Sequence, residues 1–188
     1  MRSSNFELSD FYYEGMHTTQ YENNFYGVPI QITMNNLCYR KDIFLKHSLS
    51  NPENTHDLIS SLKILHRPNK NQYGISFPGA LGMHLGHFFC NLLGATFQTP
   101  LFNFPKIYKG YDIENYKENE LSTNIKNPNF SVGLEYLKEL YQYSHPGTLN
   151  LTQGLQNIPF NNKEVCLALI WSGMSGSIDL NNMHPLYK

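Results

Sequence analysis

The sequence predicts an α/β fold in which a mixed sheet is flanked by helices. Three apolar segments of strand length lie at residues 28 to 39, 73 to 77 and 165 to 171. Between them, apolar residues recur at helical spacing in segments that begin near Thr55 and Asn127. Strands that alternate with helices are typical of α/β domains, so we expect helices to cover a central sheet.

The first predicted strand follows a tight turn. Gly27 supplies conformational freedom and Pro29 fixes φ, while the residue before a proline is pushed toward extended geometry. The strand is therefore expected to begin near Val28 and to end near Tyr39. The preceding 25 residues hold scattered aromatic and acidic side chains without a clear period, which predicts a short helix or a loop arm.

A short helical turn is predicted over residues 41 to 46, and a longer helix follows it. Thr55 is the expected N-cap of the longer helix, and Asp57 in the first turn favours a helix amino terminus. The helix is expected to end near Arg67 and to pack on the sheet through an apolar face formed by Leu58, Ile59, Leu62 and Leu65.

A glycine-bearing loop separates the second strand from the second long helix. The strand at residues 73 to 77 stops at Pro78, and residues 79 to 83 form the loop. The helix is predicted from His84, with Gly94 as its carboxyl-terminal cap.

The carboxyl-terminal half holds the clearest helix and the most apolar strand. Asn127 initiates the helix and His145 ends it. Its predicted buried stripe consists of Leu134, Leu137, Leu140 and Tyr141. Residues 165 to 171 form a continuous apolar run, which is typical of a strand buried on both faces. Residues 95 to 121 are predicted to be irregular, with a small hairpin at residues 108 to 111.

Charge and hydropathy exclude several classes of partner. The 14 Lys and Arg residues are scattered among 15 Asp and Glu residues, so no basic stripe is available for nucleic acid. The apolar stretch at residues 85 to 97 is too short to span a membrane. The aromatic share of 14% suits a carbohydrate-binding surface, but an ordinary aromatic core is the favoured interpretation.

The cysteines and histidines predict neither a metal site nor a cofactor. Cys38, Cys90 and Cys166 lie far apart without a CxxC spacing, which favours free buried thiols over a disulfide. His84 and His87 are three residues apart on a helix, but no third metal ligand is suggested nearby.

Four segments, in order along the chain, carry a family resemblance. They are YGVPIQITMNNLCYRKD, NPENTHDLISSLKIL, YGISFPGALGMHLGHFFCNLLGATF, and NPNFSVGLEYLKELY together with FNNKEVCLALIWSGMSG. In this order they resemble the bacterial extracellular solute-binding proteins of sugar ABC transporters, family 1, which have the periplasmic binding protein type 2 fold. His56, Ala95 and Asn162 stand where the family usually has tryptophan, glycine and glycine.

The resemblance implies one lobe of a two-lobed protein. Residues 1 to 28 correspond to a remnant of the first lobe and the approach to the hinge, and residues 29 to 180 to the second, carboxyl-terminal lobe. Residues 181 to 188 correspond to a tail toward a missing segment. The chain is thus expected to be truncated, and half a cleft is expected to bind its ligand weakly or not at all.

The resemblance also implies a function. The protein is expected to be the substrate-binding component of an ABC importer, which binds a sugar or related polar solute by closure of its lobes without chemistry. Its expected partner is the transporter permease, and it is expected to be a monomer outside the cytoplasm. No signal peptide opens the sequence, because polar and acidic residues follow Arg2.

The ligand-binding residues that the resemblance implies come from three parts of the chain: Gln31, Thr33, Asn35, Gly82, Met83, His84, Trp171 and Gly173. Trp171 is the only tryptophan, and the small residues after it let a ligand approach the backbone. Packing of Trp171 on a neighbouring helix is the alternative. Thr33 offers a hydroxyl where the family often has an acid, and His84 is alternatively a capping or solvent-exposed histidine.

The sequence leaves two alternative functions open. A carbohydrate-active α/β hydrolase or transferase would use Ser175 and His145, although the sequence GMSGS lacks the last glycine of the Gly-x-Ser-x-Gly motif. A nonfunctional fragment of a binding protein is the third alternative, motivated by the missing lobe and by the departures at Thr33 and Asn162.

Overall fold

The structure is a computed structural model that divides into two compact units. It describes residues 10–12, 15–16, 18–21, 24–103, 106–107, 110–111 and 122–178. Unit 1 comprises residues 1–33 and 102–123, and unit 2 comprises residues 34–101 and 124–188. The chain therefore passes from one unit to the other after residues 33, 101 and 123.

This division differs from the predicted boundary after residue 28. Residues 29–33 and 102–123 belong to unit 1, and the lobe boundaries that the resemblance implies stay a prediction. Strand pairing explains why residues 102–123 belong to unit 1. Residues 102 and 103 pair with residues 122 and 123 and with no strand of the main sheet. The predicted tail at residues 181 to 188 lies outside the described residues.

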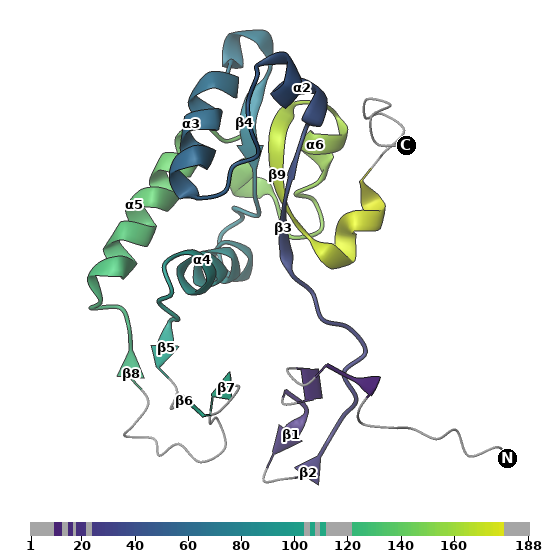
Figure 1. Cartoon of the computed structure of the whole chain (residues 1–188), viewed down its shortest axis with the longest axis vertical. Coiled ribbons are helices and arrows are strands. Elements are labelled where there is room, and N and C mark those ends of the chain that lie inside the picture. The colour runs from purple at the N-terminus through teal and green to yellow at the C-terminus, as the bar shows by residue number, and fades with distance from the viewer. Residues whose placement is uncertain are drawn as a thin grey trace, which may run out of the picture. The chain divides into compact units, whose positions relative to one another are not determined.

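Unit 2 is built on the predicted mixed sheet, with strand order β3, β9, β4 (Figure 1). The central strand β9 (Val165–Trp171) pairs antiparallel with β3 (Asn35–Tyr39) and parallel with β4 (Tyr73–Ser76). Leu167 and Ala168 are fully buried in β9. The continuous apolar run thus forms a strand buried on both faces, as predicted.

The first strand of this sheet is shorter than predicted, because β3 begins at Asn35 and not at Val28. The residue at the end of β9, Trp171, pairs with Asn35. One further pair follows: the Met34 N–H donates to Ser172 Oγ at 3.0 Å, and the Ser172 N–H donates to the Met34 carbonyl at 2.7 Å. Beyond this pair β9 supplies no further partner, so residues 28 to 33 lie outside the ladder.

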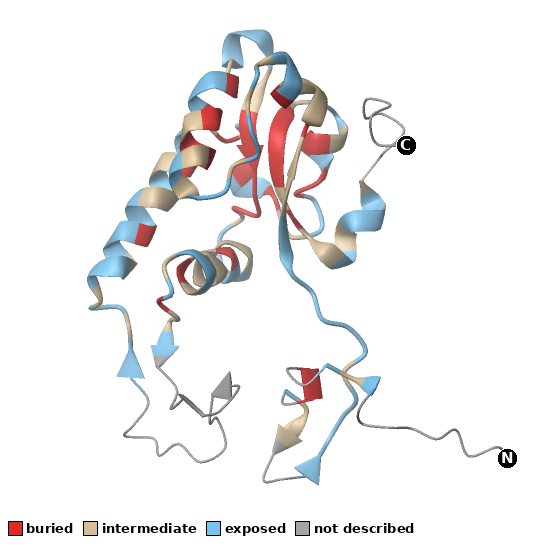
Figure 2. Ribbon diagram, in the orientation of Figure 1, coloured by how far each residue is buried: buried red, intermediate tan, exposed pale blue. Residues whose placement is uncertain are grey.

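Helices cover the two faces of the sheet unequally. One face packs against α2 (Lys41–Lys46), α3 (Thr55–Leu65), α4 (Met83–Thr96) and α5 (Pro128–Gln142). The other face packs against α6 (Ile158–Asn161) and residues of the 3-10 helix η5 (Ser172–Ser177). Figure 2 shows buried residues concentrated in β4, β9 and the inner side of α3, which places the main core between the sheet and the first group of helices.

The ends of two helices differ from the prediction. The N-cap of α3 is Asn54 and not Thr55, because the Asn54 side chain accepts a hydrogen bond from the Asp57 N–H at 2.9 Å. The helix α4 continues past Gly94 to Thr96. Gly94 does not adopt the left-handed conformation of a glycine cap, so nothing ends the helix at that position.

The buried face of α5 is rotated from the predicted stripe. Leu140 is buried and Leu137 packs against the core as predicted, but Leu134 and Tyr141 are 39% and 44% exposed, and Gly133 is buried instead. Leu93 explains the rotation, since its side chain occupies the space where a side chain of residue 133 would begin. The glycine therefore allows α4 and α5 to approach closely.

Unit 1 contains short strand pairs in its described part. They are β1 (Gln20–Tyr21) with β2 (Asn24–Phe25), β5 (Phe102–Asn103) with β8 (Ser122–Thr123), and β6 (Lys106–Ile107) with β7 (Gly110–Tyr111). The hairpin predicted at residues 108 to 111 is thus a pairing of residues 106–107 with 110–111, and Tyr108 lies outside the described residues. The segment predicted to be irregular, residues 95 to 121, contains three of these strands.

Candidate functional site

Trp171 lies at the carboxyl end of the central strand, where the resemblance implies a ligand. It is half-buried and pairs across the ladder with Asn35, whose side chain is exposed. Gly173 follows in η5 and is also exposed. Three of the eight predicted ligand-binding residues thus gather at one end of the sheet, because β3 and β9 run antiparallel and stop together.

The predicted loop residues form the start of α4. Gly82 is the N-cap residue with φ +86°, a conformation that favours glycine, and its position gives α4 no side-chain cap. Met83 is 72% exposed, and His84 is half-buried with an Nδ1 atom that has no hydrogen-bond partner. The Leu85 N–H donates to the Ala80 carbonyl at 3.0 Å, whereas the N–H groups of Met83 and His84 have no side-chain cap, and such groups attract polar oxygens.

A residue that the sequence did not single out for binding links α4 to the end of β9. The ring of His87, one turn after His84, lies 5.4 Å from the ring of Trp171 at an interplanar angle of 85°. His87 Nδ1 is 2.9 Å from Gln153 Nε2. From the sequence, His87 was considered only as a possible metal ligand, and nothing in the local pattern marked Gln153.

The remaining two predicted residues lie in unit 1. Gln31 and Thr33 are exposed and precede β3, in the segment that was expected to be a strand. Their role in ligand binding stays a prediction, as do the roles of the six residues in unit 2.

The charged pairs of the sheet lie near its opposite end. Arg40 Nη2 is 2.6 Å from Asp42 Oδ2, and the Arg40 N–H donates to the carbonyl of Cys166 at the start of β9. Burial raises the pKa of Asp42, but the hydrogen bonds and the charge of Arg40 outweigh burial and hold this pKa below its ordinary value. Near Trp171 the side chains are instead the amides of Asn35 and Gln153 and the imidazole of His87. Together with the indole of Trp171 itself, these groups suit an uncharged polar ligand.

The two residues of the hydrolase alternative lie at opposite ends of β9. His145 Nε2 is 3.3 Å from Oε2 of Glu164, the residue before the strand, whereas Ser175 follows the strand and donates to the Ser172 carbonyl at 2.7 Å. Seven residues at about 3.3 Å each separate these ends by about 20 Å. Ser175 and His145 therefore do not form a nucleophile and base pair.

Within the part of the chain that the structure describes, no group of three or more His, Cys, Asp or Glu side chains is arranged to hold a metal ion. Cys38 and Cys90 are half-buried free thiols, and Cys166 is a fully buried one. Burial raises the pKa of the Cys166 thiol to about 12.

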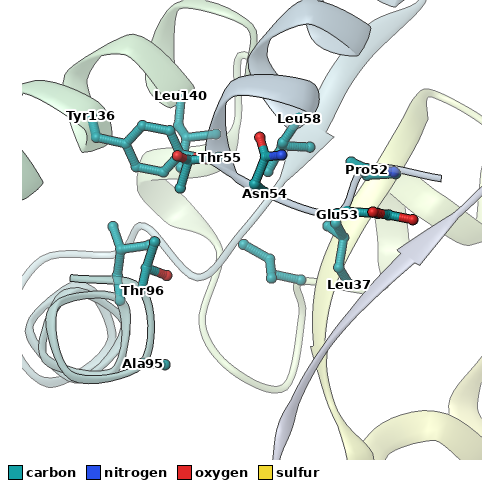
Figure 3. Close-up of a pocket in the computed structure, with 12 residues that line it drawn as sticks. Leu37, Pro52, Glu53, Asn54, Thr55, Leu58, Ala95, Thr96, Tyr136 and Leu140 are labelled. Carbon is teal, nitrogen blue, oxygen red and sulfur yellow. The ribbon is translucent and has the colours of Figure 1, made fainter. Parts of the chain in front are cut away.

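A pocket of about 480 Å³ lies at the other end of α4 (Figure 3). Asn54 and Thr55 from the start of α3, Thr96 from the end of α4 and Tyr136 from α5 contribute to its lining. Burial, with a smaller effect of the Glu139 charge, raises the pKa of Tyr136. Leu37 of β3 and its ladder partner Leu169 of β9 also line the pocket, so it reaches within two residues of Trp171 along β9.

The fold is that of the solute-binding proteins of ABC transporters. No protein-family model matches the sequence, and no curated protein matches it. Solved structures do match. An ABC transporter solute-binding protein from Agrobacterium radiobacter in complex with ribitol is 23% identical, with a TM-score of 0.71 over 96% of this chain.

Two further solved solute-binding proteins have a similar fold to this chain. Maltose-bound MalE3 of T. maritima is 18% identical with a TM-score of 0.67, over 88% of this chain and 39% of its own. An ABC substrate-binding protein from Listeria monocytogenes in complex with cycloalternan is 17% identical with a TM-score of 0.68, over 97% of this chain and 43% of its own. The chain spans 42% of the length of the Agrobacterium protein, so it corresponds to under half of each of these three structures.

Proposed function

We propose that this chain is a portion of the substrate-binding component of an ABC importer, and that it binds a sugar or polyol without chemistry. The observation that carries the proposal is the fold likeness over 96% of the chain to a solute-binding protein solved with ribitol. The matched structures named above hold ribitol, maltose and cycloalternan, which supports an uncharged, hydroxyl-rich ligand.

The residues around Trp171 fit such a ligand. The indole offers an apolar face to the C–H groups of a sugar ring, and Asn35 offers an amide that both donates to and accepts from hydroxyl groups. The uncapped first turn of α4 adds backbone N–H donors.

The same proposal sets the partners and the compartment. The protein delivers its ligand to a membrane permease, acts outside the cytoplasm and works as a monomer. No described helix combines the length and apolar character needed to cross a membrane. Because the chain spans 42% of its Agrobacterium neighbour, we expect these 188 residues to bind weakly, with a dissociation constant on the order of 1 mM.

Emission from Trp171 tests the proposal directly, because the chain has no other tryptophan. Ribitol and maltose, added separately, are expected to change the emission of the 188-residue chain saturably, and neither sugar is consumed. Because the Trp171→Ala variant contains no tryptophan, NMR chemical shifts follow binding in both this variant and the wild type. The variant is expected to lose the ligand-dependent shift changes while keeping the wild-type circular dichroism. Unaltered wild-type emission at concentrations well above millimolar, or release of a product, would refute the proposal.

A further inference from the structure

Three segments that are far apart in the sequence meet beside the candidate site. His87 lies in the second turn of α4, Gln153 follows the 3-10 helix η4 (Thr148–Asn150), and Trp171 ends β9. The rings of His87 and Trp171 are 5.4 Å apart at 85°, and Gln153 Nε2 is 2.9 Å from His87 Nδ1. The three side chains thus form a row in which His87 is the middle member.

The hydrogen bond selects the tautomer and the orientation of the neutral imidazole. An amide nitrogen only donates, so His87 Nδ1 is the acceptor and the neutral ring carries its proton on Nε2. The lone pair of Nδ1 lies in the ring plane, so a donor at 2.9 Å restricts rotation of that plane. Gln153 therefore holds the ring that contacts Trp171.

The imidazole in turn restricts rotation of the indole while leaving one indole face uncovered by His87. Perpendicular aromatic pairs are a favoured arrangement, so the contact resists rotation of Trp171 about its side-chain bonds. A perpendicular neighbour covers at most one face of the indole. His87 thus leaves a face of Trp171 uncovered, and Trp171 is only half-buried.

We propose that His87 and Gln153 are positioning residues that hold the indole of Trp171 in the orientation in which a sugar or polyol stacks on it. The proposal rests on the proposed function of Trp171. A ligand that stacks on a ring already held in place avoids the entropy cost of ordering that ring. His87 is exposed and Gln153 is half-buried, so their hydrogen bond contributes little to the core.

Two variants separate positioning from packing. Gln153→Leu removes the donor, and His87→Phe keeps an aromatic ring but removes the acceptor. Gln142→Leu is the matched control, since Gln142 is an exposed glutamine at the end of α5. Time-resolved anisotropy of Trp171 without ligand measures its rotational freedom, and titrations with ribitol and maltose measure affinity.

Both variants are expected to increase the fast component of the anisotropy decay and to weaken sugar binding roughly 3- to 10-fold. The urea midpoint is expected to stay at the wild-type value, and the double variant to resemble the single variants because the pair acts as one unit. A structural role would instead lower the urea midpoint.

The proposal is overturned if Gln153→Leu leaves the Trp171 anisotropy at the wild-type value, or if the effects of the two single variants add. Sugar binding and ring mobility are measured separately. If neither sugar binds the wild-type chain, the proposed function fails, while the ligand-free anisotropy still decides whether His87 and Gln153 hold Trp171.

Discussion

A single methyl group at residue 79 is expected to destabilise unit 2. A Cβ atom at Gly79 would lie 2.6 Å from the carbonyl oxygen of Thr148 and 2.8 Å from its Cγ2 atom. The first distance is about 0.8 Å shorter than the 3.4 Å at which ordinary contact begins. Gly79 does not have a positive φ, so the close approach alone requires glycine here.

The backbone at Gly79 and at Thr148 cannot move apart without disturbing hydrogen bonds. The Thr148 carbonyl accepts from the Leu151 N–H at 3.0 Å, and the Leu151 carbonyl accepts from the Ala80 N–H at 3.0 Å. Thr148 is also fully buried. Overpacking of this kind costs about 1–3 kcal/mol, which is the destabilisation we expect for Gly79→Ala.

Gly94→Ala is the matched control, because the same methyl group meets no atom within 4 Å at that position in α4. Alanine is favoured over glycine inside a helix by about 0.5–1 kcal/mol, so this variant is expected to be more stable than the wild type. The two variants should therefore differ by roughly 1.5–4 kcal/mol.

Urea unfolding followed by Trp171 emission measures both variants, since all three residues belong to unit 2. The expected order of midpoints is Gly94→Ala, wild type, Gly79→Ala, with similar slopes. A Gly79→Ala midpoint at or above the wild-type value would show that the loop moves away from the added methyl group without loss of stability. The reasoning from the Thr148 contact would then be wrong.

Two further predictions concern the opposite end of the sheet. Asp42→Asn is expected to lose about 1–3 kcal/mol of stability at pH 7 through its hydrogen bonds with Arg40. Because the folded-state pKa of Asp42 is lowered, this stabilisation is present above the ordinary value of about 3.9 and is lost as pH falls through the folded value. Urea unfolding at pH 7 and pH 3 checks this, and a difference between wild type and variant that is the same at both pH values contradicts it. Cys166, whose pKa burial raises to about 12, is expected to resist iodoacetamide at pH 8 in the folded protein and to react in urea. Mass spectrometry with half-buried Cys90 as the internal reference measures this, and equal Cys166 labelling with and without urea would contradict it.

Elements with a strong local signal were predicted correctly. The apolar run at residues 165 to 171 became β9, and the spacing of apolar residues after Asn54 became α3. The start of α5 was also correct, because Asn127 followed by proline is a local capping signal whose side chain accepts from the Asn129 N–H. In each case the cause lies within a few residues of the effect.

The candidate site was predictable only in part for the same reason. Trp171 was recognisable as the last residue of a buried strand that is followed by small residues. Its partners were not, since 84 residues separate His87 from Trp171 and no period or motif connects either to Gln153. The segment before β3 misled the prediction, because the turn at Gly27 and Pro29 has the pattern of a strand start.

The sequence by itself determined the α/β class, the central buried strand and the main helices, because hydrophobic periodicity and capping are local properties. The tertiary structure decided where β3 begins, since the ladder is limited by the end of β9 near Trp171. It also decided which face of α5 is buried, through the contact of Leu93 at Gly133. The row of Gln153, His87 and Trp171 exists only because the fold brings α4 and the segment after η4 to the carboxyl end of β9.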